Sequence, residues 1–168
     1  MRLKLTLACT VGLMGCGLLD GFDKYSLKEI QAVADKMQAE QPGLDGACAD
    51  GDPASCWRIG VQMMYGTWGR EKDEVGGIDF LRRACDAEHD YGCHDLGVAY
   101  KFGRGVEQDY AEARRFFEAS CPAVTNSCHY IGNMYESGRG ALKDDEQARI
   151  WYDKACRAGD SSSCDRLL

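Results

Sequence analysis

The hydrophobic and polar positions of this chain follow a pattern that predicts pairs of helices. The clearest instance lies between Cys128 and Cys164, where apolar residues recur three or four positions apart, as on one face of a helix. A glycine-containing stretch at residues 138–144 divides these positions into two runs. The first run holds Ile131, Met134 and Tyr135, and the second holds Ala148, Trp151, Tyr152 and Ala155. The pattern therefore predicts a helical hairpin.

The same unit occurs three times with a period of about 36 residues, which indicates an internal repeat. Each unit has a glycine inside its first helix. Because such a glycine costs about 1 kcal/mol relative to alanine, we expect it to mark a close approach of the two helices. A second glycine ends the first helix in a left-handed conformation, and an aspartate begins the second helix. These positions are Gly60, Gly97 and Gly132, then Gly66, Gly103 and Gly138, then Asp73, Asp109 and Asp144.

Hairpins of this kind cannot cover their apolar faces alone, so we expect them to stack on one continuous core. Residues 25–40, YSLKEIQAVADKMQAE, predict an amphipathic helix, and residues 44–49 predict the end of another. Residues 161–168 begin a further first helix. We therefore assign residues 25–50 to N-terminal capping helices and residues 51–168 to the repeats with a C-terminal half-repeat cap.

The first sixteen residues, MRLKLTLACTVGLMGC, predict an export signal. Two basic residues precede about ten mostly apolar ones, which are too few to span a bilayer as a helix. The run Leu13-Met14-Gly15-Cys16 resembles a bacterial lipobox, so we expect a signal peptide at residues 1–15, a lipidated Cys16 and a tether at residues 16–24. The alternatives are an ordinary signal peptide or a short buried helix. Because Gly17 and not aspartate follows the cysteine, we expect the outer membrane of a Gram-negative envelope.

Eight further cysteines form four pairs, and each pair flanks the loop between one unit and the next. Positions that lie symmetrically about a short turn can approach within the roughly 5.5 Å that a disulfide needs between Cα atoms. Closing such a loop is worth about 2.5 kcal/mol on the chain-entropy model, and an export signal agrees with an oxidising compartment. The pairs are Cys48 with Cys56, Cys85 with Cys93, Cys121 with Cys128, and Cys156 with Cys164.

A zinc site is the competing interpretation of one cysteine pair. Cys85, His89, Cys93 and His94 are residue types that zinc accepts. Only this loop has its own histidine, whereas all four loops have the cysteine pair. A shared structural role explains every pair, so we expect disulfides, no metal and no cofactor.

The repeated residues resemble the Sel1-like repeat, a relative of the tetratricopeptide repeat. The resemblance covers residues 44–168, and the cysteine pair in each unit is similar to the cysteine-rich Sel1 subfamily known from Helicobacter secreted proteins. It implies an all-α, right-handed α/α solenoid of helical hairpins with one disulfide per repeat. The first unit departs from the pattern, because Met63 replaces a tyrosine and Gly66-Thr67-Trp68-Gly69 replaces Gly-x-Gly. We expect a different path for that loop.

The net charge of the chain and the absence of known catalytic motifs exclude several classes of function. A formal net charge of −7, without a basic run, makes nucleic acid an unsuitable partner. An anionic lipid surface would also repel this negative charge, so we expect only the acyl chains to hold the protein at the membrane. The sequence has no Gly-x-Ser-x-Gly, Ser-x-x-Lys or His-Glu-x-x-His motif. Residues 161–163, all serine, indicate a helix start, and the equivalent repeat positions of His94 and His129 indicate surface residues.

Three functions remain open, and one of them is a purely structural role, for instance as an assembly or stress factor for envelope proteins. Some members of the resembled subfamily have been described as penicillin-binding proteins with weak β-lactamase activity, so the alternative is a β-lactam-binding hydrolase, for which we can assign no catalytic residue. The function we favour is an exported, lipid-anchored scaffold that binds a protein or peptide partner in the cell envelope. Solenoids of this type offer a concave face made by the first helices.

We expect the binding face to consist of first-helix residues that do not pack inward. Exposed Trp and Tyr residues on this face favour binding hot spots. The alternative is that Trp57 and Phe102 pack on neighbouring repeats. The expected face consists of Trp57, Met64, Tyr65, His94, Lys101, Phe102, His129 and Asn133.

Overall fold

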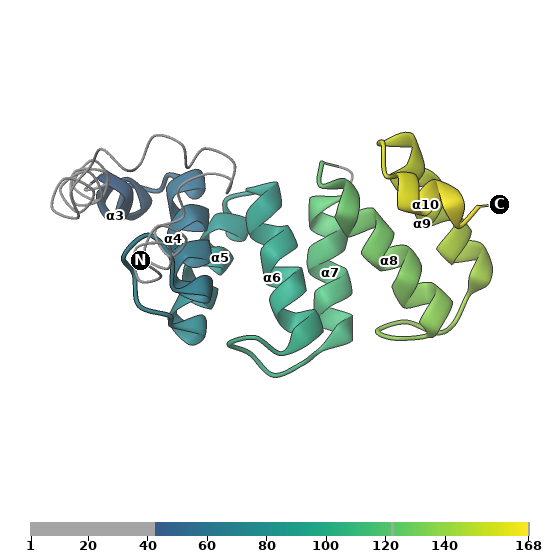
Figure 1. Ribbon diagram of the computed structural model, residues 1–168, viewed down its shortest axis with the longest axis horizontal. Helices are drawn as coiled ribbons and strands as arrows, with labels where there is room; N and C mark the ends of the chain where they lie inside the picture. Colours follow the sequence, from purple (N-terminus) through teal and green to yellow (C-terminus); the bar gives the residue numbers. More distant parts are fainter. Residues whose placement is uncertain (1–42, 122, 168) are drawn as a thin grey trace, which may run out of the picture.

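The computed structural model describes residues 43–121 and 123–167, and every regular element in this part of the chain is an α-helix. The helices follow one another along the long axis of the molecule, from α3 to α10 (Figure 1). Their bounds are α3 Gly43–Ala49, α4 Pro53–Tyr65, α5 Glu74–Asp86, α6 Asp90–Phe102, α7 Tyr110–Ser120, α8 Thr125–Ser137, α9 Asp145–Arg157 and α10 Ser161–Asp165. The all-α fold that the hydrophobic pattern predicts is confirmed.

Three helical hairpins form the repeat units. Helix α4 packs against α5 in unit one, α6 against α7 in unit two, and α8 against α9 in unit three. Each second helix also packs against the first helix of the next unit, and α3 covers α4 at the N-terminal end. The first helices α4 and α6 contact each other as well. This neighbour-to-neighbour packing is that of a solenoid, in which stacking buries what a single hairpin would leave exposed.

The ends of the helices follow from the repeated aspartates and glycines. The carboxylates of Asp73, Asp109 and Asp144 accept hydrogen bonds from backbone N–H groups in the first turns of α5, α7 and α9. These bonds satisfy donors that have no partner inside the helix. The three glycines that end α4, α6 and α8 have φ angles of 64°, 66° and 69°, in the left-handed region that favours glycine. Helix α8 has Val124 at its N-cap position, and no side chain caps its first turn.

The glycines inside the first helices lie where two helices meet most closely. A Cβ atom at Gly97 would lie 2.8 Å from the ring of Phe117 on α7, and the equivalent atom at Gly132 would lie 2.6 Å from the ring of Tyr152 on α9. The glycine in unit one faces Leu81 in the same way, at 2.8 Å. Carbon atoms in contact prefer about 3.5–4.0 Å, so these positions have no room for a side chain.

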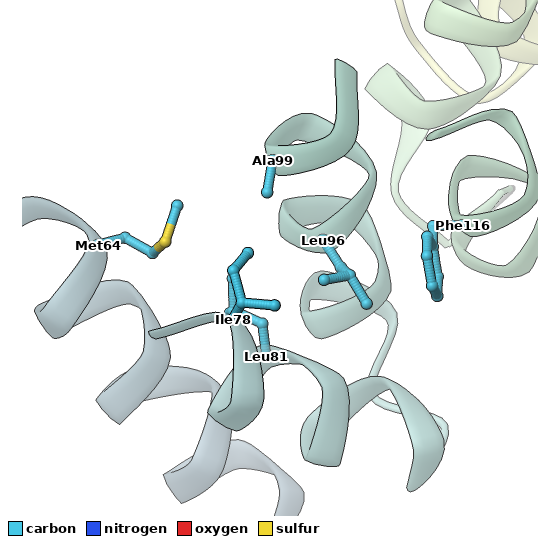
Figure 2. Close-up of a cluster of buried hydrophobic side chains, with 6 residues drawn as sticks. All are labelled: Met64, Ile78, Leu81, Leu96, Ala99 and Phe116. Carbon is cyan, nitrogen blue, oxygen red and sulfur yellow. The ribbon is translucent and has the colours of Figure 1, made fainter. Parts of the chain in front are cut away.

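The core runs from unit to unit between the helices. Figure 2 shows one cluster, to which Met64 of α4, Leu81 of α5, Leu96 of α6 and Phe116 of α7 contribute. A second cluster joins α3 to unit one, and a third joins units two and three. Since the clusters draw on adjacent units, removing one unit would expose the apolar face of the next.

Four disulfides close the loops between units, at the pairs that the register predicts. They join α3 to α4, α5 to α6, the residue after α7 to α8, and α9 to α10, with Cα–Cα distances of 4.7, 4.5, 5.3 and 4.8 Å. Each distance lies within the usual range for a disulfide.

Unit one has the divergent loop that its sequence predicts. Trp68 takes a left-handed backbone conformation with φ of 57°, which is uncommon for a residue with a large side chain. Arg70 in the same loop donates hydrogen bonds to Gln62 and Asp45, and so ties the loop to α4 and α3. The predicted lipidation at Cys16, the tether and the helix at residues 25–40 lie outside the described residues.

Candidate functional site

A pocket opens between the first helices of units one and two. Its floor is apolar, because Leu81 and Ala99 are buried there, and its rim carries the more exposed side chains of Tyr65 and Arg104. The lining residues are Val61, Met64, Tyr65, Leu81, Asp95, Val98, Ala99 and Arg104. The pocket is small, with room for about one water molecule, so its apolar floor offers a ligand a surface to pack on and does not enclose a side chain.

Two large hydrophobic side chains are exposed at equivalent repeat positions, one at the rim of this pocket and one at the end of the next first helix. Tyr65 in the last turn of α4 is 56% exposed, and Phe102 in the last turn of α6 is 51% exposed. Met64, which we expected on the binding face, is only 6% exposed and belongs to the core. That expectation was wrong, because the end of α4 leans on α5 and α6 and covers the methionine.

The positions between α6 and α8 that correspond to the pocket hold different side chains. Lys101 takes the place of Met64, Tyr130 that of Asp95, and Asn133 that of Val98. The ammonium of Lys101 lies 3.8 Å from the ring centroid of Tyr130 and 4.8 Å from that of Phe102, as in a cation–π interaction. Burial lowers the pKa of Lys101, and the nearby Arg139 lowers it further. We define the first-helix face as Val61, Tyr65, Asp95, Val98, Lys101, Phe102, Tyr130 and Asn133 together with the loop residues Arg104 and Arg139.

Trp57 connects unit one to unit two. Its indole N–H donates a hydrogen bond of 2.7 Å to the carboxylate of Asp95, and its ring stacks on His89 at 5.2 Å. Burial raises the pKa of Asp95, and the bond from Trp57 works in the opposite direction. Trp57 is partly buried in this packing, as in the alternative stated above.

His94 lies in a buried polar chain between units two and three. Its Nδ1 atom is 2.7 Å from the hydroxyl of Ser127, which is 2.6 Å from the hydroxyl of Ser120. Ser120 also lies within reach of the backbone carbonyls of Phe116 and Phe117. When Ser120 donates to a carbonyl it accepts from Ser127, and Ser127 in turn accepts from Nδ1–H of His94. Burial lowers the pKa of His94.

His129 makes the equivalent contact one unit later. Its Nδ1 atom is 2.7 Å from the hydroxyl of Ser163 and 3.1 Å from the carboxylate of Asp160. The hydroxyl of Ser163 also donates to Asp160, whose pKa is lowered mainly by that bond. Both histidines are half-buried, so each is only partly at the surface that the repeat positions predict. The sequence holds a signal that could have predicted these contacts. A serine stands immediately before Cys128 and before Cys164, and in each case a histidine follows the corresponding cysteine one unit earlier.

This set of Ser, His and Asp does not have the arrangement of a hydrolytic triad. In a triad one imidazole nitrogen faces the nucleophile and the other faces the carboxylate, whereas Nδ1 of His129 faces both groups here. Ser163, Ser127 and Ser120 are each 0% exposed, so a substrate carbonyl has no route to these hydroxyls. These histidine–serine contacts tie neighbouring units together.

The face of α8 towards the C-terminal end of the solenoid is polar, and the charge of Glu136 on this helix is paired with Arg166. The hydroxyl of Tyr152 donates to Glu136 at 2.7 Å, and Arg166 binds the same carboxylate at 3.0 Å. Burial and the bond to Glu136 raise the pKa of Tyr152. Asn133, which we expected on the binding face, is tied to Tyr152 by a contact of 2.8 Å.

The residues considered for zinc have other partners. Cys85 and Cys93 are joined in a disulfide, and Nδ1 of His89 accepts a hydrogen bond from the backbone of Gly92 at the start of α6. Within residues 43–121 and 123–167, no group of three or more His, Cys, Asp or Glu residues is arranged to hold a metal ion.

Fold and repeat register place this chain in a class of disulfide-bonded helical repeat proteins. The sequence profile of the Sel1 repeat matches residues 53–89, 90–121 and 125–160, which is more than half of the chain. The chain therefore belongs to the Sel1 repeat family, as the residues predict.

Individual relatives agree with this assignment. A Helicobacter pylori protein, "Putative beta-lactamase HcpC", is 34% identical over 65 residues, which cover 39% of this chain and 21% of the relative. A protective antigen of uropathogenic Escherichia coli has a similar structure, with a TM-score of 0.71 and 28% identity, over 74% of this chain and 27% of that one. Helicobacter pylori cysteine rich protein B shares the fold, with a TM-score of 0.57, 22% identity and coverage of 84% of this chain and 98% of that one. The matches to HcpC and to the antigen span only about a fifth to a quarter of those proteins.

Family and structure together support a coarse description. Solenoids of Sel1 repeats are scaffolds for protein–protein interaction, and they bind their partners through extended surfaces of stacked helices. Four disulfides indicate an extracytoplasmic, oxidising location. Among the described residues, no helix is long and apolar enough to cross a bilayer.

Proposed function

We propose that this chain is an exported scaffold, anchored by a lipid at Cys16, that binds an extended segment of a partner protein in the cell envelope. The observation that carries the proposal is the apolar-floored pocket between α4 and α6, with the exposed ring of Tyr65 at its rim, together with the exposed ring of Phe102 beside the rim residue Arg104. Aromatic side chains dominate binding energy when they surround a pocket that excludes water. The partner segment would lie across α4, α6 and α8 and pack an apolar side chain against the floor of the shallow pocket.

Site-specific photo-crosslinking tests where the partner binds. A photoreactive phenylalanine analogue replaces Phe102 in one variant and Ile150 in another, in cells that export the protein. Ile150 is a matched control, because it is 52% exposed but lies on α9, a second helix. We expect a discrete crosslinked partner from position 102 and none from position 150. Equal crosslinking from both positions would contradict the proposed face.

Alanine substitutions test the energetic role of the two rings. Tyr65→Ala and Phe102→Ala should each weaken capture of the crosslinked partner by about tenfold or more, as for a binding hot spot. Their melting temperatures should stay close to that of the unsubstituted protein, because more than half of each side chain is exposed. The same substitution at Ile150 controls for a general loss of exposed apolar surface.

The lipid anchor is tested separately. Intact-mass analysis of the exported protein should find an acylated N-terminal Cys16, and Cys16→Ala should move the protein from the membrane fraction to the soluble fraction. A signal peptide cut elsewhere, with no acyl group, would remove the anchor from the proposal and leave the binding face untouched.

A β-lactam-binding hydrolase is the alternative function, and the name of HcpC is its main support. The buried serines beside His94 and His129 speak against it. Turnover of a chromogenic β-lactam by the pure protein would favour the hydrolase, provided that the activity follows the protein through every purification step.

A further inference from the structure

We infer that the first-helix face between units two and three binds acidic side chains of a peptide, next to an apolar residue that packs over the shallow pocket between α4 and α6. The inference deepens the function proposed above and depends on it. It starts from three cations, Lys101, Arg104 and Arg139, that form no ion pair with any residue in the described part of the chain.

The acidic groups near these cations are already engaged. Glu74, whose pKa is lowered in part by Arg104, pairs with Lys72 at 2.8 Å. Asp95, which lines the pocket with Arg104, accepts its hydrogen bond from Trp57. Since none of the three cations forms an ion pair within the described residues, a ligand anion does not have to displace an internal ion-pair partner.

Lys101 is the most constrained of the three cations. It is half-buried, it lies over the rings of Tyr130 and Phe102, and a charge close to it, that of Arg139, has the same sign. A partly desolvated cation with a like charge nearby is stabilised when an anion arrives, because the attraction is poorly screened away from bulk water. The rings hold the lysine in place, so little side-chain entropy remains to be lost on binding.

The charge pattern along the face limits how far such a ligand would extend. Between units one and two, Arg104 stands at the rim of an apolar pocket, and its guanidinium lies 5.5 Å from the ring centroid of Phe102. Between units two and three, Lys101 and Arg139 leave a positive surface. Beyond them, Arg166 is neutralised by Glu136. An acidic segment is therefore favoured over the middle of the face and not over its C-terminal end.

A peptide suits this surface better than a nucleic acid does. The whole chain has a formal net charge of −7, which repels a polyanion whose charges continue past the three cations. A short peptide can place one or two carboxylates over Lys101 and Arg139 and then continue without charge. The exposed rings of Tyr65 and Phe102 add contacts that an aromatic or aliphatic residue can use.

Selection from a random-peptide display library on the full, oxidised chain tests the inference. We expect enriched peptides in which Asp or Glu residues adjoin a Phe, Leu or Trp. The strongest enriched peptide is then synthesised in two forms, one unchanged and one with Asn and Gln in place of Asp and Glu. By fluorescence anisotropy at low salt, the amide form should bind roughly tenfold more weakly, and the difference should shrink at about 0.5 M salt as screening increases.

Matched variants locate the effect. Lys101→Met combined with Arg139→Gln should reduce the affinity for the acidic peptide by roughly tenfold and leave that for the amide form unchanged. The control is Lys154→Met combined with Arg149→Gln on α9, because Lys154 also lies over an aromatic ring, that of Trp151 at 4.7 Å. The control variant should bind both peptides as the unsubstituted chain does. Circular dichroism confirms that each variant is folded.

Each result of the selection supports or contradicts a specific part of the proposal. Enriched peptides without acidic residues, or acidic peptides whose affinity is the same in both double variants, would overturn the inference and leave the peptide-binding function standing. No enrichment over a denatured sample of the same chain would overturn both. Tighter binding of a single-stranded oligonucleotide than of the acidic peptide, dependent on Lys101 and Arg139, would replace the peptide by a nucleic acid.

Discussion

The junction between units one and two and the junction between units two and three share one backbone plan and differ in their chemistry. At the first junction, Trp57 binds Asp95 and an apolar pocket forms over Leu81. At the second, His94 binds Ser127, and Lys101 lies over Tyr130 where the first junction has a buried methionine. The comparison shows that the glycines, caps and disulfides set the spacing of the units, while the remaining first-helix positions are free to change a pocket into a charged surface.

The largest effect should come from removing the disulfide at one junction. Replacing both Cys85 and Cys93, or both Cys121 and Cys128, by serine should lower the free energy of unfolding by about 2.5 kcal/mol, since the loops have nearly equal lengths. Urea denaturation measures this. A much smaller loss at the second junction would show that its buried serine–histidine chain holds the units together without the bridge.

The next effect concerns the close approach within unit two. Gly97→Ala should cost about 2 kcal/mol, because the new methyl group would lie 2.8 Å from the ring of Phe117. Gly46→Ala in α3 is the matched control, since no atom lies within 4 Å of its Cβ position and alanine favours a helix. The control should be neutral or stabilising by up to about 1 kcal/mol. Equal melting temperatures for the two variants would contradict the tight packing at Gly97.

The polar chain at the second junction should contribute somewhat less. Ser127→Ala removes the hydroxyl between His94 and Ser120 and should cost about 1–2 kcal/mol, because two buried groups lose a partner. Trp57→Phe at the first junction removes the bond to Asp95 and should cost about 1 kcal/mol. If the Trp57 variant were the less stable of the two, ring packing would matter more there than the hydrogen bond.

The smallest effect is a pH dependence of the second junction. Burial lowers the pKa of His94 in the folded chain, so the unfolded chain binds more protons once the pH falls below about 6.5, the ordinary histidine value. Stability should therefore decline from pH 7.5 towards pH 5 more steeply in the unsubstituted protein than in His94→Asn. Asp95, whose raised pKa acts in the opposite sense, interacts electrostatically with His94, so the difference between the two profiles reports the pair and not His94 alone. Parallel pH profiles would contradict the burial of His94.

For the repeat units in the described part of the chain, the local pattern of the sequence was sufficient to predict the helices, their ends and the disulfides. Gly97 and Asp109 are short-range signals. The close approach of two helices requires a glycine at position 97, and the start of α7 favours an aspartate at position 109. The cysteine pairing followed from the same register, since both members of each pair flank one short loop. Three copies of the unit made each of these signals recognisable, because a chance residue would not recur at the period of the repeat.

Only the tertiary structure decided which of the remaining first-helix residues face solvent. Met64 and Tyr65 are adjacent in the sequence, yet one is in the core and the other is exposed. His94 reaches a serine one unit away, and three cations from two loops and one helix come together on one face. Burial and charge at these positions depend on how one unit is rotated against the next, and that rotation is fixed by side-chain packing between units.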